Sequence, residues 1–456
     1  MPGPPRIDGP EATVTPDLSG KVWINTQAAP LVPGRYGAVV DQRRTNWAGN
    51  VTYGAARVHR PESVDELRRI VAGSGRIRAL GSGHSFSLVA DTAGDLVSLD
   101  ALPPVVEIDP ARRSVTVAAG LRYADVAAVL HRNGLALPNM ASLPHISVAG
   151  SCATATHGSG DTLRCLSAAV TALELVAPDG TLRHLHSGGD RREVFPGVVV
   201  ALGALGVVTR VTLAVEPAFE VAQRVRVGVP LDEVAGRFDE IFGAAYSVSA
   251  FTDWRSGEAA VWLKCRTGWP APGWSGGLGA AEAVHPVPGM DPASCTLQMG
   301  VAGPWHERLP HFRPESTPSA GQELQSEWFL PREAVGRAFE EVRGVAGKVA
   351  PVLHVSEVRT VRGDDLWLSP AYGRDTVTLH FTWHNDPGAV LPVVAELEER
   401  LVPLGARPHW GKVATMSAGD VIAGYERAED FARVASEFDP DGKFRNAFVE
   451  TLFPSG

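Results

Sequence analysis

The chain has 456 residues, more than a single hydrophobic core usually spans, and this length predicts two or three domains. A net charge of −9 and the lack of a basic stripe interleaved with aromatic residues argue against a nucleic-acid partner and against attraction to anionic lipids. No run reaches the roughly 18–20 apolar residues of a membrane span, and the first twenty residues do not resemble a secretory signal. The cysteines, Cys152, Cys165, Cys265 and Cys295, lack CxxC spacing, which favours reduced thiols in a cytoplasmic protein over a disulfide framework or a zinc site.

The first part of the chain combines an irregular start with a strand that runs into a glycine-rich loop. Residues 1–44 are rich in proline and glycine, and we interpret them as a flexible N-terminal extension. A helix is predicted over 63–73, where Ser63 can cap the first turn. A short apolar strand over 77–80 then breaks abruptly into Gly81-Ser82-Gly83-His84-Ser85.

A second segment of small residues follows at 138–160, which is dense in Gly, Ala, Ser and Thr and almost free of charge. Such a backbone can approach another molecule closely. The remaining elements up to residue 215 are predicted in chain order as a hairpin over 105–108 and 115–117, a helix over 123–131, strands over 170–177 and 181–186, and a helix end at 201 that turns into a strand.

The composition changes at about residue 216, where tryptophan and proline become frequent, and we predict a domain boundary there. The region 350–385 is rich in strand patterns. Helices are predicted over 386–405 and over 419–438.

The two glycine-rich segments indicate a phosphate-bearing cofactor. A strand that runs into Gly81-Ser82-Gly83 exposes backbone N–H groups that can cradle a pyrophosphate, although a lone GxG is more often an ordinary tight turn. The loop is not a Walker motif, since no Lys-Ser/Thr follows, and the third glycine of a Rossmann fingerprint is missing. The presence of 138–160 in the same domain favours one extended cofactor that lies along both segments.

The order LGSGHS, ASLPHISVAGSCATATHGSG, GALGVVT resembles the vanillyl-alcohol oxidase family of FAD-linked oxidases. The stretches NWAGN and HWGK resemble its branch of alditol and aldonolactone oxidases, and NMASLPH, PVPGM, AYGRDTV, HFTW and FDPDGKF look closest to bacterial alditol oxidases. The resemblance covers residues 45–456. It implies an α+β fold with an FAD-binding domain at 45–215, a sheet-and-helix substrate domain at 216–412, and a C-terminal return to the FAD domain at 413–456.

The resemblance also implies the cofactor contacts. His84 matches the histidine that often carries FAD through a covalent bond to the flavin 8α-methyl group. The positions that match the family's FAD contacts are Ala79, Leu80, Gly81, Ser82, Gly83, His84, Ser85, Ser142, Ser147, Gly150, Thr154, Ala155, Thr156, His157, Val208 and His409. For each Ser or Thr, the alternative is a hydroxyl that caps its own turn.

Polar pairs at a spacing of two residues suggest a substrate site. Glu357 and Arg359 share one face of a strand, as do His380 and Thr382. From the residues alone, a surface salt bridge on a solvated strand is the simpler interpretation. The resemblance instead implies a polyol pocket over the flavin, lined by Ser142, Glu357, Arg359, Thr382 and Lys412.

The implied reaction is oxidation of a terminal primary alcohol by hydride transfer to FAD, with O2 reduced to hydrogen peroxide and with no metal. Either His380 or Lys412 would accept the hydroxyl proton. The resemblance further suggests a monomer. The alternatives are an aldonolactone oxidase on the same fold, a metal-dependent hydrolase built from His145, His157, His380 and His409, and a carbohydrate-binding protein that uses tryptophans such as Trp254, Trp269 and Trp274.

Overall fold

The computed structural model describes residues 14–16, 22–24, 45–270, 272–316 and 322–454. The predicted flexible extension at 1–44 lies outside the described residues, apart from strands β1 (Val14–Pro16) and β2 (Val22–Ile24). Within the described chain, no helix combines the length and apolar character needed to cross a membrane.

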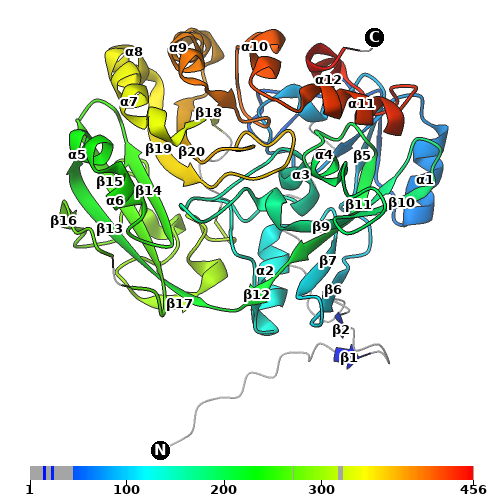
Figure 1. Cartoon of the computed structure of the whole chain (residues 1–456), viewed down its shortest axis with the longest axis horizontal. Coiled ribbons are helices and arrows are strands. Elements are labelled where there is room, and N and C mark those ends of the chain that lie inside the picture. Colours follow the sequence, from blue (N-terminus) through cyan, green and yellow to red (C-terminus); the bar gives the residue numbers. More distant parts are fainter. Residues whose placement is uncertain (1–13, 17–21, 25–44, 271, 317–321, 455–456) are drawn as a thin grey trace, which may run out of the picture.

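One half of the molecule contains the loops of the glycine-rich segments (Figure 1). A small parallel sheet has the order β3-β5-β4. A larger antiparallel sheet has the order β1-β2-β6-β7-β11-β9-β10. The bounds are β3 Arg57–His59, β4 Ile77–Leu80, β5 Asp95–Ser98, β6 Val106–Asp109, β7 Ser114–Ala118, β9 Val170–Val176, β10 Leu182–His186 and β11 Val207–Ala214.

Four helices within the described residues 45–215 pack against these sheets: α1 (Val64–Gly73), α2 (Tyr123–Arg132), α3 (Val148–Ala153) and α4 (Phe195–Val199). Two short strands, β8 (Leu135–Ala136) and β12 (Glu216–Pro217), pair with each other. The predicted elements up to residue 215 are therefore confirmed, including the Ser63 cap, whose side chain accepts from the Glu66 N–H. The hairpin is confirmed as β6 and β7.

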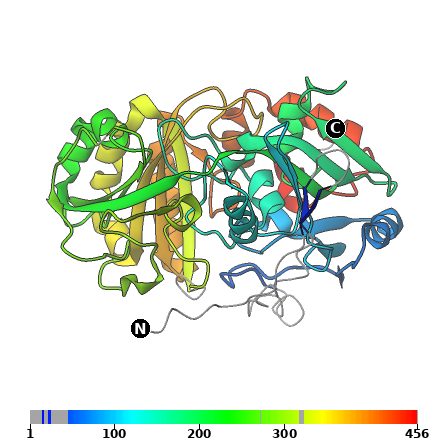
Figure 2. The same cartoon turned by 90° about the horizontal axis from the view of Figure 1, so that it is seen from below.

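The other half is built on an extended antiparallel sheet of order β16-β13-β15-β14-β19-β20-β18-β21, with β17 paired to β13 (Figures 1 and 2). The bounds are β13 Glu220–Pro230, β14 Ser247–Thr252, β15 Glu258–Arg266, β16 Leu278–Gly279, β17 Ala302–Pro304, β18 Glu323–Pro331, β19 Leu353–Val361, β20 Thr376–His384 and β21 Arg407–Pro408. One face is covered by α5 (Leu231–Gly236), α6 (Phe238–Phe242), α7 (Val335–Gly344), α8 (Ala346–Val349) and α9 (Pro387–Leu401).

Strand periodicity gives this sheet two chemically different faces. Val358, Leu379 and Phe381 belong to the apolar core under the helices. Their neighbours in sequence, such as Glu357 and His380, point to the opposite face, because successive side chains of a strand alternate. That inner face is turned toward the half that carries the glycine-rich segments, so polar residues are enclosed between the two halves.

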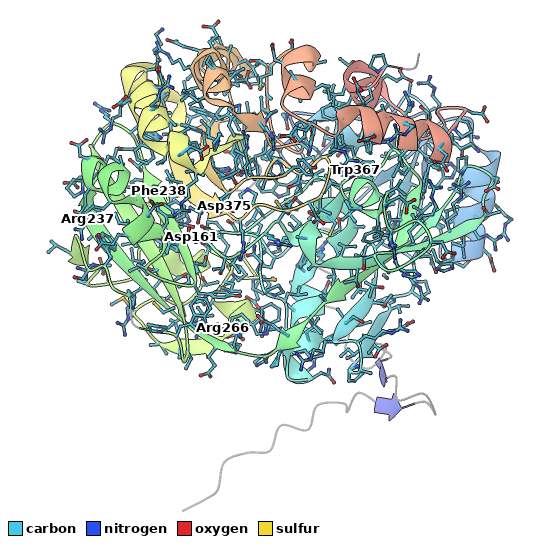
Figure 3. All side chains as sticks on the ribbon, viewed as in Figure 1. Asp161, Arg237, Phe238, Arg266, Trp367 and Asp375 are labelled. Carbon is cyan, nitrogen blue, oxygen red and sulfur yellow. The ribbon has the colours of Figure 1, made fainter. Side chains whose placement is uncertain are left out.

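The two halves are joined where the second glycine-rich segment ends. Gly160 donates its N–H to the Thr360 carbonyl on β19 at 2.9 Å. Next to it, Asp161 binds both terminal nitrogens of Arg332 at 2.8 and 2.9 Å. The Arg332 guanidinium lies over the ring of Phe238 on α6, and Figure 3 shows Asp161 beside Phe238. These contacts hold residues 138–160 against the large sheet.

The last part of the chain returns to the first half through α10 (Ala418–Ala423), α11 (Ala428–Phe438) and α12 (Ala447–Leu452) (Figure 1). The single helical stretch predicted over 419–438 is two helices, because α10 ends at Ala423 with Gly424 as its C-cap, and α11 starts at Ala428. The buried guanidinium of Arg78 on β4 donates to the carbonyls of Val89 and Leu202. It also donates, at 2.7 Å, to the carbonyl of Phe444 near the C-terminus. The domain boundaries at 44/45, 215/216 and 412/413 stay predictions.

Candidate active site

A cavity of about 310 Å³ lies between the two halves. Both glycine-rich segments line one side of it, and the polar inner face of the large sheet lines the other. The predicted cofactor positions that line it are Ala79, Leu80, Gly81, Ser82, Gly83, His84, Ser85, Ser142, Ser147, Gly150, Thr154, Thr156, His157, Val208 and His409. Ala155 does not line it: its side chain is buried in the core beneath, with a positive φ of 53°.

The first and second segments touch at Ser147. A Cβ added to Gly81 would lie 2.3 Å from the Ser147 hydroxyl oxygen, and one added to Gly150 would lie 2.7 Å from it. Ser147 also donates its N–H to the Ser82 hydroxyl at 3.2 Å. Only residues without side chains allow this approach, which leaves a strip of backbone open to the cavity.

His84 is held at the end of this strip by residues from distant parts of the chain. Its ring stacks on Trp47, with ring centroids 5.2 Å apart. Directly after it in the chain, the Ser85 carbonyl accepts from the Asn46 side chain at 2.9 Å, and Phe86 donates its N–H to the Gly411 carbonyl at 2.7 Å. Thus NWAGN and HWGK, which carried part of the family resemblance, brace the first loop.

The His84 imidazole is neutral and has one ring nitrogen available. Burial, together with the charge of His145, lowers the pKa of His84 to about 4. Its Nδ1 is buried and has no hydrogen-bond partner. Buried polar atoms are almost always paired, so an orphan nitrogen at the rim of a cavity indicates a missing bonding partner.

Across the cavity, strand register brings three ionisable residues into one row. Glu327 on β18 is directly opposite His380 on β20, and His380 is directly opposite Glu357 on β19. Arg359 and Thr382 follow two residues along the same face. All five side chains are buried, so a surface salt bridge on a solvated strand is the wrong interpretation of Glu357 and Arg359.

Glu327 is the centre of this row. Its carboxylate accepts from Arg359 Nη2 at 2.5 Å and from Lys412 Nζ at 2.7 Å, and its side chain is fully buried. HWGK reaches it because β21 pairs with β18, and His409 donates its N–H to the Glu327 carbonyl at 2.9 Å. Burial alone would raise the pKa of Glu327, but Arg359 and Lys412 outweigh burial and hold that pKa well below its usual range.

Glu357 is ionised for the same reason. Its pKa is lowered because Arg359 and His311 outweigh the effect of burial. Two carboxylates, Glu327 and Glu357, therefore face two cations, Arg359 and Lys412. The histidines nearby are neutral, since burial lowers the pKa of His380 to about 4 and that of His409 well below its usual value. The formal charges of the cluster balance.

The hydrogen bonds of His380 fix its tautomer. Lys412 Nζ lies 2.5 Å from His380 Nδ1, and an ammonium can only donate, so Nδ1 is the acceptor. His380 Nε2 then carries the proton and donates to the Thr382 hydroxyl at 3.1 Å. Burial and the charge of Arg359 lower the pKa of Lys412, opposed by Glu327.

Ser142 joins the two sides of the cavity. Its hydroxyl oxygen accepts from Arg359 Nη1 at 3.4 Å, and its carbonyl accepts the His311 N–H at 3.1 Å. The structure thus brings together the predicted residues Ser142, Glu357, Arg359, His380, Thr382, His409 and Lys412.

Sequence reasoning missed Glu327, His311 and Lys264. Glu327 follows Glu323 and Gln325 at a spacing of two, and this alternation is the same pattern that selected Glu357 with Arg359. His311 Nε2 lies 2.7 Å from the carboxylate oxygen Oε1 of Glu357, and Lys264 Nζ lies 3.1 Å from the other ring nitrogen of His311. No sequence pattern pointed to these last two residues.

The metal-site hypothesis finds a partial counterpart. Ligand atoms of His157, Glu327 and His409 lie within 4.8 Å of one another. His145 is elsewhere, with its Nε2 2.6 Å from the Pro314 carbonyl. A divalent cation beside Glu327 would meet the fixed charges of Arg359 and Lys412, so we do not assign a metal to this cluster.

Taken together, the backbone strip, the neutral His84 and the buried charge cluster define the chain as a cofactor-binding protein, with a glycine-lined cradle on one side of the cavity and a polar sheet on the other. Comparison with known proteins agrees with this class. Residues 55–186 match the FAD binding domain family, and residues 321–452 match the D-arabinono-1,4-lactone oxidase family.

The chain is 53% identical over 412 residues to an alditol oxidase of Streptomyces sp., covering 90% of this chain and 98% of the relative. It is 30% identical to an L-gulono-1,4-lactone dehydrogenase of Mycobacterium tuberculosis, covering 90% and 98%, and 28% identical to the L-gulonolactone oxidase of Bos taurus, covering 90% and 97%. The chain belongs to the family of FAD-dependent oxidases that contains the alditol and aldonolactone oxidases.

The fold is also that of a solved cholesterol oxidase from Brevibacterium sterolicum, with a TM-score of 0.71 at 13% identity, covering 90% of this chain and 96% of that chain. This likeness confirms the predicted α+β class and the vanillyl-alcohol oxidase type of fold. The prediction of FAD as cofactor is confirmed by the family, and the residues fit it: the cradle at Gly81 and Gly150 admits a close backbone approach, and His84 Nδ1 lacks a partner.

Proposed function

We propose that this protein is an alditol oxidase, which converts the terminal primary alcohol of a polyol such as xylitol or sorbitol to the aldose. The observation that carries the proposal is the charge-balanced cluster of Glu327, Glu357, Arg359 and Lys412 facing the His84 loop. A neutral, hydroxyl-rich substrate needs paired donors and acceptors without excess charge, because an unpaired buried polar group is costly. The Streptomyces alditol oxidase supports the same assignment.

The chain's residues divide the binding of a polyol between them. Glu357 offers carboxylate oxygens as acceptors, and Arg359 offers donors. The Ser142 hydroxyl accepts from Arg359, and the Thr382 hydroxyl accepts from His380. Each hydroxyl therefore keeps its own proton to donate to a substrate oxygen. Lys412 has a third N–H beyond those given to Glu327 and His380. We propose these five residues as the substrate contacts.

When bound, FAD would supply the hydride acceptor, and O2 would take up the two electrons and become hydrogen peroxide. Loss of hydride from the alcohol requires that its hydroxyl proton be accepted. Because His380 Nδ1 is engaged by Lys412, we assign this step to the pair: Lys412 gives a proton to His380 and takes the substrate proton. Glu327 Oε2 lies 3.6 Å from His380 Nδ1 and stabilises the resulting positive charge.

The proposal includes a covalent FAD on His84. A neutral imidazole with an unpartnered nitrogen is the form that can bond to an electrophilic carbon. Residues 45–215 with 413–456 would form the FAD-binding domain, and 216–412 the substrate domain. We also propose that the protein is cytoplasmic and monomeric. Free cysteines fit the cytoplasm, where thiols stay reduced, and three of them, Cys152, Cys165 and Cys295, are buried.

The test is a visible spectrum before and after acid precipitation, combined with peroxide detection during turnover. A yellow wild-type pellet, a colourless His84→Ala pellet, and peroxide from xylitol are the expected results. A colourless wild type after FAD feeding would contradict the flavin on His84.

An aldonolactone oxidase is the second candidate, because residues 321–452 match the D-arabinono-1,4-lactone oxidase family. Turnover of gulono- or arabinono-lactone at higher kcat/KM than xylitol would favour it over the alditol oxidase.

A further inference from the structure

Lys264 on β15 is a buried ammonium that the proposed reaction does not use. It is 1% exposed and does not line the cavity. Its Nζ contacts the carbonyls of Leu309 and Pro310 at 2.5 and 3.0 Å and His311 Nδ1 at 3.1 Å. An ammonium has three N–H groups, so these three neighbours use all of them.

His311 connects this lysine to the substrate site. Its Nε2 lies 2.7 Å from Glu357 Oε1, and its backbone N–H binds the Ser142 carbonyl. The ring is enclosed by Phe251 and Trp262, both in edge-to-face contact at centroid distances of 5.4 Å. His311 therefore has little freedom to move, and what it presents to Glu357 depends on which ring nitrogen carries the proton.

The donor count decides that question. The two carbonyls cannot donate, so a protonated Lys264 must direct its third N–H at His311 Nδ1. His311 Nδ1 is then an acceptor, and Nε2 carries the proton that Glu357 accepts. In the opposite tautomer, the His311 Nδ1–H would face an N–H of Lys264, and the lone pair of His311 Nε2 would face the carboxylate of Glu357. Neither pair could form a hydrogen bond, so buried polar groups would be left unpaired on both sides of His311.

We propose that Lys264 is a positioning residue for substrate binding. It fixes His311 in the Nε2–H tautomer, which holds Glu357 Oε1; Glu357 Oε2, which lies 3.6 Å from Arg359 Nε, then accepts from a substrate hydroxyl. This inference rests on the proposed function for the identity of the substrate. Lys264 acts through His311 and touches neither the substrate nor the cofactor cavity.

The acid–base order of the groups supports the assignment. Burial lowers the pKa of Lys264 to about 7, opposed by Glu357 and Cys295, and burial together with Lys264 lowers that of His311 to about 4. Below pH 7 the proton shared by the pair therefore resides on Lys264, with His311 neutral.

The first test reads the tautomer itself. The ¹⁵N spectrum of the histidine-labelled holoenzyme at pH 6, without substrate, identifies the protonated nitrogen of His311, with His311→Gln used to assign its resonances. The expected form is Nε2–H. An Nδ1–H form in the wild type overturns the proposal, even if Lys264 variants fail to fold. Because no substrate is present, this result is independent of whether xylitol is the substrate.

The second test is a double-mutant cycle on KM. Lys264→Met should raise KM for xylitol about tenfold or more, because the charge-assisted hydrogen bond that orients His311 toward Glu357 is lost. The change in kcat should be much smaller. Glutamine at 311 keeps an N–H directed at Glu357 without help from Lys264, so adding His311→Gln to Lys264→Met should recover part of the lost affinity. A double variant no better than Lys264→Met, or a Lys264→Met protein with wild-type KM, overturns the proposal. A wild type that oxidises no polyol at all refutes the proposed function and leaves the tautomer result standing.

Discussion

Glu327→Gln tests the view that one buried carboxylate organises the catalytic face. Glu327 accepts from Arg359 and Lys412 at 2.5 and 2.7 Å with its side chain fully buried. An amide keeps the shape but removes the charge, so the cluster changes from balanced to one excess positive charge. Breaking a buried pair by removing one partner typically costs about 3–5 kcal/mol.

The expected size of the effect follows from the length of the chain. At roughly 2.1 cal/mol/K per residue, 456 residues give an unfolding entropy of about 1 kcal/mol/K near Tm, so Tm should fall by about 3–5 °C. Flavin reduction by xylitol in stopped flow should slow by roughly 10- to 100-fold, because Arg359 and Lys412 lose a charged hydrogen-bond acceptor.

The matched control is Glu437→Gln. Glu437 also binds an arginine, Arg191, through two contacts at 2.5 and 2.8 Å, but both side chains are solvent-exposed. Exposed pairs contribute about 0–1 kcal/mol, so Tm should change by no more than about 1 °C, with normal flavin reduction. If Glu327→Gln behaved like this control, the central role of Glu327 would be refuted.

Further predictions address pH, the substrate contacts and the cradle. The folded-state pKa values of Glu327 and Glu357 lie below their usual 4.5, so the ionised carboxylates stabilise the fold above pH about 4.5 and lose this effect as the pH falls. The Tm of the wild type should therefore drop below pH 5. The Tm of Glu327→Gln should drop less steeply over the same range. Thr382→Val should raise KM for xylitol about tenfold, because a hydroxyl that contacts the substrate is lost. The control, Thr378→Val on the same strand, removes a buried hydroxyl without a hydrogen-bond partner and should leave KM unchanged. Equal effects of the two substitutions would argue against a substrate contact at Thr382. Gly81→Ala should abolish flavin retention, since its Cβ would lie 2.3 Å from the Ser147 hydroxyl oxygen. Adding Ser147→Ala should restore part of the visible flavin absorbance. Gly75→Ala, whose Cβ would have nothing within 4 Å, should not affect flavin retention.

The elements that could be predicted from the sequence are those with local causes. The cap at Ser63 and the hairpin at Asp109-Pro110 depend on neighbouring residues, and both are found where expected. The helical stretch near the end was wrong in one detail, because Gly424 ends α10 before a new helix begins. The family resemblance depended on the order of the motifs along the whole chain, which no local pattern contains.

The candidate site was predicted where polar residues alternate on recognisable strands, as for Glu357 with Arg359 and for His380 with Thr382. Glu327 escaped although it follows the same alternation, since what makes it important is its partners Arg359 and Lys412, which are 32 and 85 positions away. Lys264 and His311 are single polar residues in apolar surroundings, and their meaning comes only from packing. Long-range pairing of this kind depends on the completed fold.

The Arg78 contact with Phe444 has a consequence for how the enzyme is made. Arg78 precedes His84 by six residues, yet one of the carbonyls that accept from its buried guanidinium belongs to residue 444. A nascent chain that has not yet reached Phe444 lacks one acceptor for this guanidinium, which lines the same cavity as the His84 loop. Peroxide production is therefore expected only from chains that contain the segment around Phe444.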